Sequence, residues 1–180
     1  MKYDIIYADP PWQYNNKITR GAAESHYPTM SLDELKALPV QDLASDNCVL
    51  FLWATYPCIE YALELIKAWG FKYKTLGFQW VKVYRKQTDK FFIGLGNWTR
   101  GNTEPCLLAV KGSPKRFSGG VRQLVIAPVQ RHSQKPNEVR IRIKELMGFD
   151  KKCIELFARE KRNGWDSWGN EVESDIKLGE

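Results

Sequence analysis

Long apolar segments are missing from this 180-residue sequence. The longest uninterrupted apolar run, Cys48 to Ala54, has seven residues, whereas a membrane-spanning helix needs about 20. No secretory signal pattern precedes the first strand-like run, which starts at Tyr3. We therefore expect a cytoplasmic protein that does not contact a membrane.

Patterns for metal binding and disulfides are missing as well. The four cysteines are spaced by 10, 48 and 47 residues, and with only two histidines no CxxC or similar metal-type spacing occurs. This distribution favours scattered buried thiols in a reducing compartment and predicts no metal site. The cysteines are Cys48, Cys58, Cys106 and Cys153.

Repeats, low-complexity tracts and Gly/Ser linkers are also lacking. The length fits one domain with one core, and we predict a single domain over residues 1–172 followed by a charged tail at 173–180. Lys and Arg outnumber Asp and Glu by 27 to 21, which gives a formal net charge of +6. A basic surface favours nucleic acid as a partner, because neutralising phosphates releases counterions. The expected assembly is a monomer or a homodimer.

Buried strand patterns alternate with helical patterns along the chain. Apolar runs predict strands at 3–8, 48–53, 71–83, 106–110, 124–127 and 152–157. Ser31 and Glu34 have the spacing of a capping box that opens a short helix, and two more helices are predicted at 57–69 and 136–147. This order indicates an α/β fold with a mostly parallel central sheet and helices on both faces.

Two strand ends are the expected ligand site, since ligands bind beyond the carboxyl ends of strands in such sheets. The first strand leads into Asp9-Pro10-Pro11-Trp12, and the last predicted strand ends at Phe157-Ala158-Arg159. Asp-Pro-Pro alone is typical of a turn. The Trp at its end and the buried strand before it favour a functional site.

Each residue of the DPPW tetrapeptide suits chemistry on the amino group of a planar ring. An adenine amine is a poor nucleophile, because its lone pair is delocalised into the ring. The Asp9 carboxylate and a backbone carbonyl can accept its two N–H bonds, while Pro10 and Pro11 stiffen the turn and remove backbone donors. Trp12 offers a face on which a base can stack, worth roughly 1–3 kcal/mol. Asp9 would orient and stabilise the amine electrostatically, without acting as a committed base.

Seven further motifs follow DPPW in order: HYPTM at 26–30, LFLW at 50–53, WVK at 80–82, VKG at 110–112, SQKP at 133–136, ELFAR at 155–159 and WGNE at 168–171. Together they run from about Tyr3 to Glu171 and resemble the MT-A70 family. This family of N6-adenine methyltransferases includes the catalytic subunit of the mRNA adenosine methyltransferase and smaller bacterial and phage enzymes.

The resemblance implies a Rossmann-like methyltransferase fold and S-adenosyl-L-methionine as the methyl donor. It implies that the tetrapeptide is catalytic, with Asp9 and Pro10 between the cofactor and the target amine. Lys135 matches a lysine that meets the methionyl carboxylate. The other matches are Phe157 and Arg159 beside the nucleoside, Asn170 and Glu171 at the ribose hydroxyls and adenine edge, and Tyr27, Trp53, Trp80 and Lys82 around the target-base pocket.

The sequence departs from the family pattern in three ways. Glu171 replaces the Gln of most members, and its carboxylate can still accept bonds from a ribose diol. Lys161 and Arg162 replace the His and Asn that often follow the ELFAR-like motif, so those two roles are not carried over. Larger members have a segment before the catalytic strand that helps to hold the cofactor adenine, whereas this chain begins almost at that strand.

Two weaker patterns lie between residues 82 and 116. Gly94-Leu95-Gly96 begins like a dinucleotide fingerprint, but Thr99 stands where the third Gly belongs, so we reject a nicotinamide site. A loop beside the target-base pocket and a plain surface loop both fit it. Basic residues also interleave with aromatic ones here, which is typical of a phosphate-tracking surface and equally of an ordinary solvated face.

The sequence thus predicts methyl transfer to the N6 amine of adenine in DNA. The compact chain resembles the bacterial and phage members more than those with added RNA-binding domains, which favours DNA. RNA is the first alternative. A non-catalytic nucleic-acid-binding relative is the second, and the intact DPPW tetrapeptide together with Lys135 argues against it.

Overall fold

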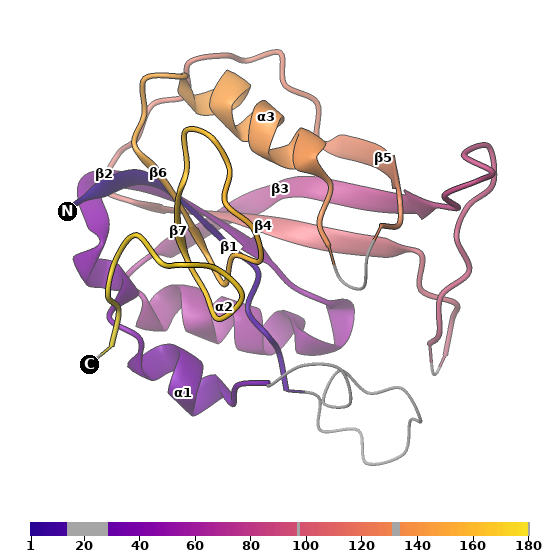
Figure 1. Cartoon of the computed structure of the whole chain (residues 1–180), viewed down its shortest axis with the longest axis horizontal. Coiled ribbons are helices and arrows are strands. Elements are labelled where there is room, and N and C mark those ends of the chain that lie inside the picture. Colours follow the sequence, from indigo (N-terminus) through magenta and orange to yellow (C-terminus); the bar gives the residue numbers. More distant parts are fainter. Residues whose placement is uncertain (14–28, 97, 131–133, 180) are drawn as a thin grey trace.

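The computed structural model describes residues 1–13, 29–96, 98–130 and 134–179 (Figure 1). Within these residues the chain forms one seven-stranded sheet and three α-helices. The strands are β1 (Tyr3–Ala8), β2 (Ala44–Trp53), β3 (Lys72–Val83), β4 (Thr103–Lys111), β5 (Leu124–Pro128), β6 (Cys153–Leu156) and β7 (Asp166–Trp168). The helices are α1 (Leu32–Ala37), α2 (Ile59–Ala68) and α3 (Asn137–Met147), with short 3-10 turns η2 (Val40–Asp42) and η3 (Tyr56–Cys58).

The sheet is mixed, with the strand order β5-β3-β4-β2-β1-β6-β7. β1 pairs in parallel with β2 and β6, β6 with β7, and β3 with β5, whereas β4 is antiparallel to both of its neighbours. Every described strand except β4 therefore runs in one direction. The carboxyl ends of β1, β2, β3 and β6 lie at one edge of the sheet together with the amino end of β4, and we call this the carboxyl edge.

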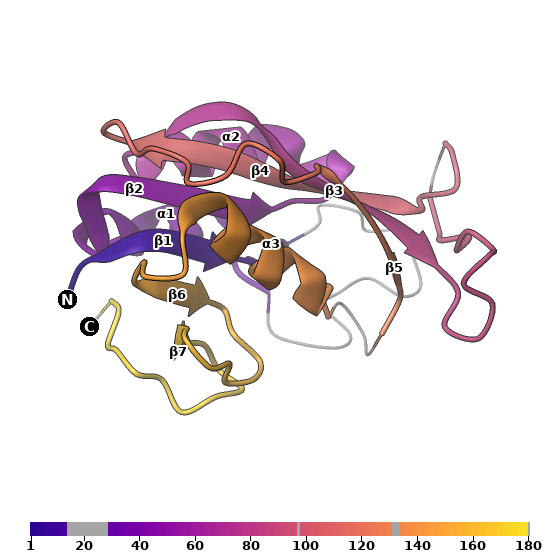
Figure 2. The ribbon, with the colours of Figure 1, turned by 90° about the horizontal axis from the view of Figure 1, so that it is seen from above.

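Helices cover both faces of the sheet, with α1 and α2 on one side and α3 on the other (Figures 1 and 2). The two faces of β2 show why, because its side chains alternate in direction. Leu50 belongs to the core cluster that contains α1 and α2, while Phe51 belongs to the cluster that contains Val139 and Ile143 of α3. The unbroken apolar run of β2 thus reflects a strand buried on both sides.

The helix and strand predictions agree with these bounds to within a few residues, apart from β7. This three-residue strand pairs with β6 and follows it in sequence, so the strand at 152–157 is not the last one. α2 begins at Ile59 because η3 precedes it, and Gly70 follows α2 with a φ of 79°. A positive φ is costly for residues with a Cβ, which explains glycine at this position.

The predicted capping box of α1 is present. The Ser31 hydroxyl accepts a bond from the backbone N–H of Glu34, and the Glu34 carboxylate accepts one from the backbone N–H of Ser31 at 2.7 Å. Ser31→Ala is expected to lower the free energy of unfolding by about 0.5–2 kcal/mol, because the backbone N–H of Glu34 loses the hydroxyl oxygen that accepts its hydrogen bond. Urea denaturation measures this, with Ser113→Ala, a change at an exposed serine outside the helices, as the control. Identical midpoints for the two variants would contradict the capping role.

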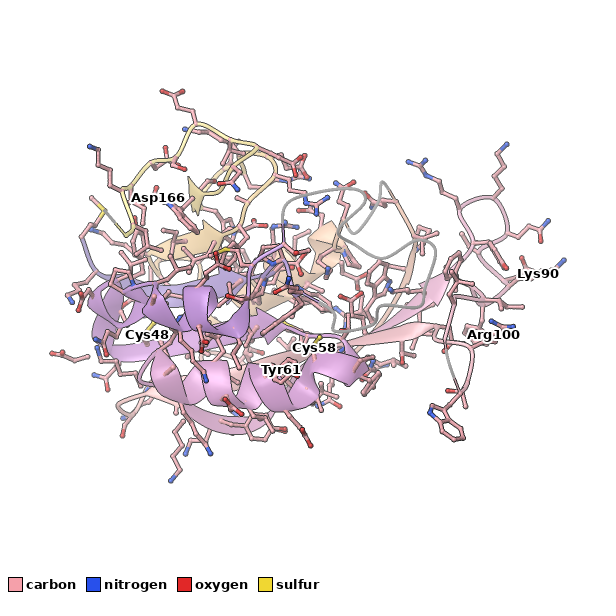
Figure 3. The ribbon with its side chains drawn as sticks, turned by 90° about the horizontal axis from the view of Figure 1, so that it is seen from below. Cys48, Cys58, Tyr61, Lys90, Arg100 and Asp166 are labelled. Carbon is pink, nitrogen blue, oxygen red and sulfur yellow. The ribbon has the colours of Figure 1, made fainter. Side chains whose placement is uncertain are left out.

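All four cysteines are buried and carry free thiols, as the sequence predicted. Figure 3 labels Cys48 in β2 and Cys58 at the start of α2, at separate places in the layer between sheet and helices. None of the described helices combines the length and apolar character that crossing a bilayer requires.

Two segments that carry many charged residues contribute to the packing. In the segment after residue 172, Leu178 is buried and Ile176 packs against the core cluster of α1 and α2. Arg140 of α3 is buried and its Nε donates to Glu155 of β6 at 2.7 Å. The Arg140 guanidinium also lies 5.1 Å from the ring centre of Tyr7. The pair of Arg140 and Glu155 therefore joins α3 to the sheet.

Candidate active site

The two strand ends singled out in the sequence lie side by side. Ala8 at the end of β1 pairs with Leu156 at the end of β6, so Asp9 and Phe157 leave the sheet at neighbouring positions. A cavity opens between the two segments that follow. It is lined by Asp9, Pro10, Pro11, Met30, Phe157, Ala158, Arg159, Trp168, Asn170 and Glu171. Seven of the predicted catalytic or cofactor-binding residues thus line this cavity.

Lys135 meets Asp9 across 126 positions of sequence, with Nζ 2.8 Å from Asp9 Oδ2. The lysine precedes α3 and is only 5% exposed, and its Nζ is also 3.1 Å from Glu104 Oε1. Trp53 lies beneath it, with the ring centre 5.6 Å from Nζ. A buried ammonium requires such partners, because an unpaired charge in the interior is costly.

Glu104 is the site residue that the sequence reasoning missed. It lies at the amino end of β4, which the antiparallel direction brings to the carboxyl edge, and it also pairs with Lys82 of β3 at 2.9 Å. A row of alternating charges therefore runs from Lys82 through Glu104 and Lys135 to Asp9. The available signal was a carboxylate at the start of an otherwise apolar strand, where a buried charge implies a partner.

Each charged group in this row shifts the pKa of its neighbours. Burial raises the pKa of Asp9 above its ordinary value and Lys135 opposes this shift, while Glu104 adds to it. Burial alone would lower the pKa of Lys135, but Asp9 and Glu104 raise it above its ordinary value. Burial would likewise raise the pKa of Glu104, yet Lys135 and Lys82 hold it below its ordinary value. These shifts keep the lysine and Glu104 charged at neutral pH, while burial favours the neutral form of the Asp9 carboxyl.

Each residue of the DPPW turn after Asp9 takes part in a hydrogen bond. The backbone N–H of Trp12 donates to the Pro10 carbonyl at 2.9 Å, and that of Met30 donates to the Pro11 carbonyl at 2.9 Å. Both proline carbonyls thus already accept one bond, and each retains a second lone pair. Trp12 is 6% exposed and its Nε1 donates to the Trp53 carbonyl at 3.1 Å. Little of its face is accessible in this conformation, and base stacking on Trp12 stays a prediction.

The residues assigned to the target-base pocket lie at different depths. Trp53 and Trp80 are buried, and their indole N–H groups donate to the Tyr7 hydroxyl and the Ala127 carbonyl. Lys82 lies over the Trp80 ring at 4.8 Å and stays partly exposed. The two tryptophans therefore belong to the core beneath the site, and Lys82 is the residue of this set whose side chain reaches the protein surface. Tyr27 lies outside the described residues.

The segment after β6 forms the second wall of the cavity. Phe157 has a φ of 61°, and among the described residues it is the one with a side chain in the left-handed region. Such backbone strain concentrates at functional sites. Its ring packs edge-on against Trp168 at 5.4 Å, and Arg159 Nε lies 3.5 Å from Glu171. The aromatic pair gives this wall an apolar patch next to a charged rim.

Lys161 and Arg162, which replace the family's His and Asn, make contacts other than with the cavity. Lys161 pairs with Asp175 at 2.7 Å, and Arg162 pairs with Glu160. Asp175 also accepts a bond from the backbone N–H of Ser167 in β7. These contacts hold the carboxyl-terminal segment against the β7 region, and neither side chain lines the cavity among the described residues.

Known proteins resemble this chain over nearly its whole length. The sequence profile of the family described as MT-A70 matches residues 3–171. The chain is 37% identical to the type II methyltransferase M.MunI of a Mycoplasma species, over 95% of this chain and 78% of that protein. It is 31% identical to the human N(6)-adenosine-methyltransferase catalytic subunit METTL3, over 96% of this chain and 28% of that protein. The likeness to the Arabidopsis thaliana N(6)-adenosine-methyltransferase MT-A70-like protein is also 31%, over 94% of this chain and 24% of that protein. The chain thus spans about a quarter of the length of these two eukaryotic relatives.

Proposed function

This chain belongs to the MT-A70 family, and we propose that it transfers the methyl group of S-adenosylmethionine to the N6 amine of adenine in DNA. The observation that carries the proposal is the ion pair between Lys135 and Asp9, a residue that lines the cavity. It brings the carboxylate that would hold an amine to the cation that would hold a methionyl carboxylate. We also assign the mixed sheet with helices on both faces to the Rossmann-like methyltransferases.

The residues around the cavity fit S-adenosylmethionine. Pro10, Phe157 and Trp168 supply apolar surface for the nucleoside and the thioether carbons. Asn170 and Glu171, which line the same cavity, supply polar groups for a ribose diol. Lys135 supplies the buried cation. When bound, this donor supplies an electrophilic methyl group on a sulfonium.

The protein's own contribution is alignment and charge. Asp9 accepts an N–H bond from the target amine, and a proline carbonyl of the rigid turn accepts the second through its remaining lone pair. Because the methyl group is already activated, the reaction needs orientation more than a strong base, and orientation supplies up to roughly 7–11 kcal/mol. Lys135 keeps Asp9 ionised and positioned while Glu104 orients Lys135.

DNA is the proposed substrate because of how the relatives align. The relative matched over most of its own length is a type II methyltransferase, a class that acts on DNA. The N(6)-adenosine-methyltransferases are less similar to this chain, at 31% identity. On duplex DNA the adenine must leave the stack, at a cost of a few kcal/mol.

The proposal is tested by methyl transfer from tritiated S-adenosylmethionine to duplex DNA, single-stranded DNA and RNA of matched sequence. N6-methyladenine in digested DNA, identified by mass spectrometry, is the expected product. Label in RNA alone would replace DNA by RNA as the substrate. Titration calorimetry with S-adenosylmethionine separates a poor choice of DNA sequence from a protein that does not bind the donor at all.

Glu104→Gln is expected to move the acidic limb of the kcat/KM profile to lower pH. Asp9 must be ionised to accept the amine, and the negative charge of Glu104 raises the pKa of Asp9. Removing that charge lowers this pKa, so Asp9 stays ionised further into the acid range. The pH profile of methyl transfer measures the shift, with Glu64→Gln on the exposed face of α2 as the control. An unmoved limb, or one moved to higher pH, would contradict the assignment of this limb to Asp9.

A further inference from the structure

The connection between β3 and β4, residues 84–102, projects beyond the sheet at the carboxyl edge. Figures 1 and 2 show it extending past the end of β3 and β4, away from the helices. Its two ends are fixed, because Lys82 at the end of β3 pairs with Glu104 at the start of β4. Glu104 in turn holds Lys135, which binds Asp9. The projecting loop and the catalytic carboxylate are thus anchored to the same row of charges.

The far half of this loop is tightly folded. The backbone N–H of Gly94 donates to the Gly101 carbonyl at 3.0 Å. A Cβ on Gly94 would lie 2.2 Å from that carbonyl oxygen, and a Cβ on Gly96 would lie 2.0 Å from the Thr99 carbonyl oxygen. Such contacts are impossible for any residue with a side chain. The Gly94-Leu95-Gly96 pattern is therefore explained by a close backbone turn and not by a phosphate-binding loop.

This turn presents apolar side chains to solvent. Trp98 is 99% exposed, and Ile93 and Leu95 are exposed as well. An indole fully in water is unusual, since tryptophan normally buries most of its large apolar surface. Exposed apolar patches rimmed by polar residues mark interaction sites.

The chemistry around the turn favours nucleic acid as the partner. Residues 84–102 contain four basic residues, Arg85, Lys86, Lys90 and Arg100, against a single acidic one, Asp89. All four basic residues are exposed, and Figure 3 shows Lys90 and Arg100 at the projecting end of the molecule. A hollow lined by Tyr84, Arg85, Lys86 and Gln87 lies in the same loop. Cations beside an exposed ring suit a phosphate backbone with a base stacked on the ring.

We propose that Trp98 is a stacking wedge that inserts beside the target adenine of duplex DNA and stabilises the extruded state. This rests on the proposed function, because it assigns a substrate contact to the same reaction. Apolar side chains that enter between base steps unstack them, and the inserted ring replaces the stacking that the departing base loses. The wedge lies at the same edge as Asp9, where the extruded base has to arrive.

The test compares Trp98→Ala with the wild-type protein on unmethylated genomic DNA, both native and heat-denatured. Initial rates of tritiated methyl transfer at subsaturating DNA are measured on each form. On native DNA the variant is expected to lose about 5- to 100-fold, which corresponds to the loss of one base–aromatic stack. On denatured DNA the loss is expected to be much smaller, because no base has to leave a duplex. Trp98→Phe should recover most of the activity on native DNA.

Phe117→Ala is the matched control. Phe117 is an aromatic residue that is 79% exposed, and it follows the carboxyl end of β4, at the edge of the sheet opposite Asp9. This variant is expected to match the wild type on both forms of DNA. Light scattering of the wild type and Trp98→Ala reports whether the exposed ring joins copies of the protein instead.

Several results would overturn the wedge while leaving the proposed function intact. These are wild-type rates for Trp98→Ala on native DNA, equal losses on native and denatured DNA, activity of the wild type on denatured DNA alone, or a drop in oligomeric mass in the variant. A wild-type protein that methylates neither form of DNA would instead refute the proposed function, and the wedge with it.

Discussion

Asp9→Asn is expected to lower kcat for methyl transfer by roughly 10²–10³-fold while leaving the affinity for S-adenosylmethionine within a few-fold of the wild type. The substitution keeps the shape of the side chain but removes its charge, and its NH₂ group would compete with the N–H bonds of the target amine for acceptors. The loss is confined to the rate because Asp9 acts on charge that develops in the transition state. Single-turnover rates with mass-spectrometric detection of N6-methyladenine measure the effect.

Asp4→Asn is the matched control for this prediction. Asp4 lies near the amino end of β1, and Asp9 follows the carboxyl end of the same strand. The Asp4 carboxylate accepts bonds from the Ser45 hydroxyl and the Lys152 backbone N–H. The same chemical change there tests whether loss of a carboxylate from β1 lowers activity through stability alone. A turnover of Asp9→Asn that stays near the wild-type rate would remove Asp9 from the mechanism.

The apolar pattern of the sequence predicted most of the fold because the sheet is buried. Strands covered on both faces, such as β2, leave continuous apolar runs, and the Ser31–Glu34 spacing identified the start of α1. β7 was missed because a three-residue strand in a polar segment leaves no periodic signal. The direction of β4 was equally hidden, since pairing direction depends on tertiary contacts that a run of apolar residues does not encode.

The candidate site was predictable in its members but not in its contacts. The motif match selected Asp9 and Lys135, yet nothing in 126 intervening positions shows that their side chains meet at 2.8 Å. Glu104 was missed because its role arises from the reversed strand that carries it to the edge. Trp53 was expected near the base, but the burial of its ring beneath Lys135 follows from packing that no local pattern reports.

Lys135→Ala is expected to weaken binding of S-adenosylmethionine by roughly 30-fold or more, which corresponds to about 2 kcal/mol for loss of one partner of a buried charge pair. The contact is proposed to involve the methionyl carboxylate, so S-adenosylhomocysteine should lose affinity by a similar factor. 5′-Methylthioadenosine lacks that carboxylate, and its affinity should change little. Calorimetry with the three ligands separates a lost ion pair from a general collapse of the cavity.

Lys135→Ala also leaves two carboxylates without their shared cation. Asp9 and Glu104 would then repel each other, and the pKa of Asp9 would rise because Lys135 no longer opposes the effect of burial. The rate at saturating donor is therefore best measured at alkaline pH, where both carboxylates are ionised, and there it should fall less than the affinity does. Lys82→Met is the matched control, since Lys82 pairs with Glu104 but not with Asp9 among the contacts of the described residues. Equal losses of affinity for all three ligands would count against a carboxylate contact, because only a charge-specific bond distinguishes the full donor from its truncated nucleoside. An unchanged dissociation constant for S-adenosylmethionine would count against it as well.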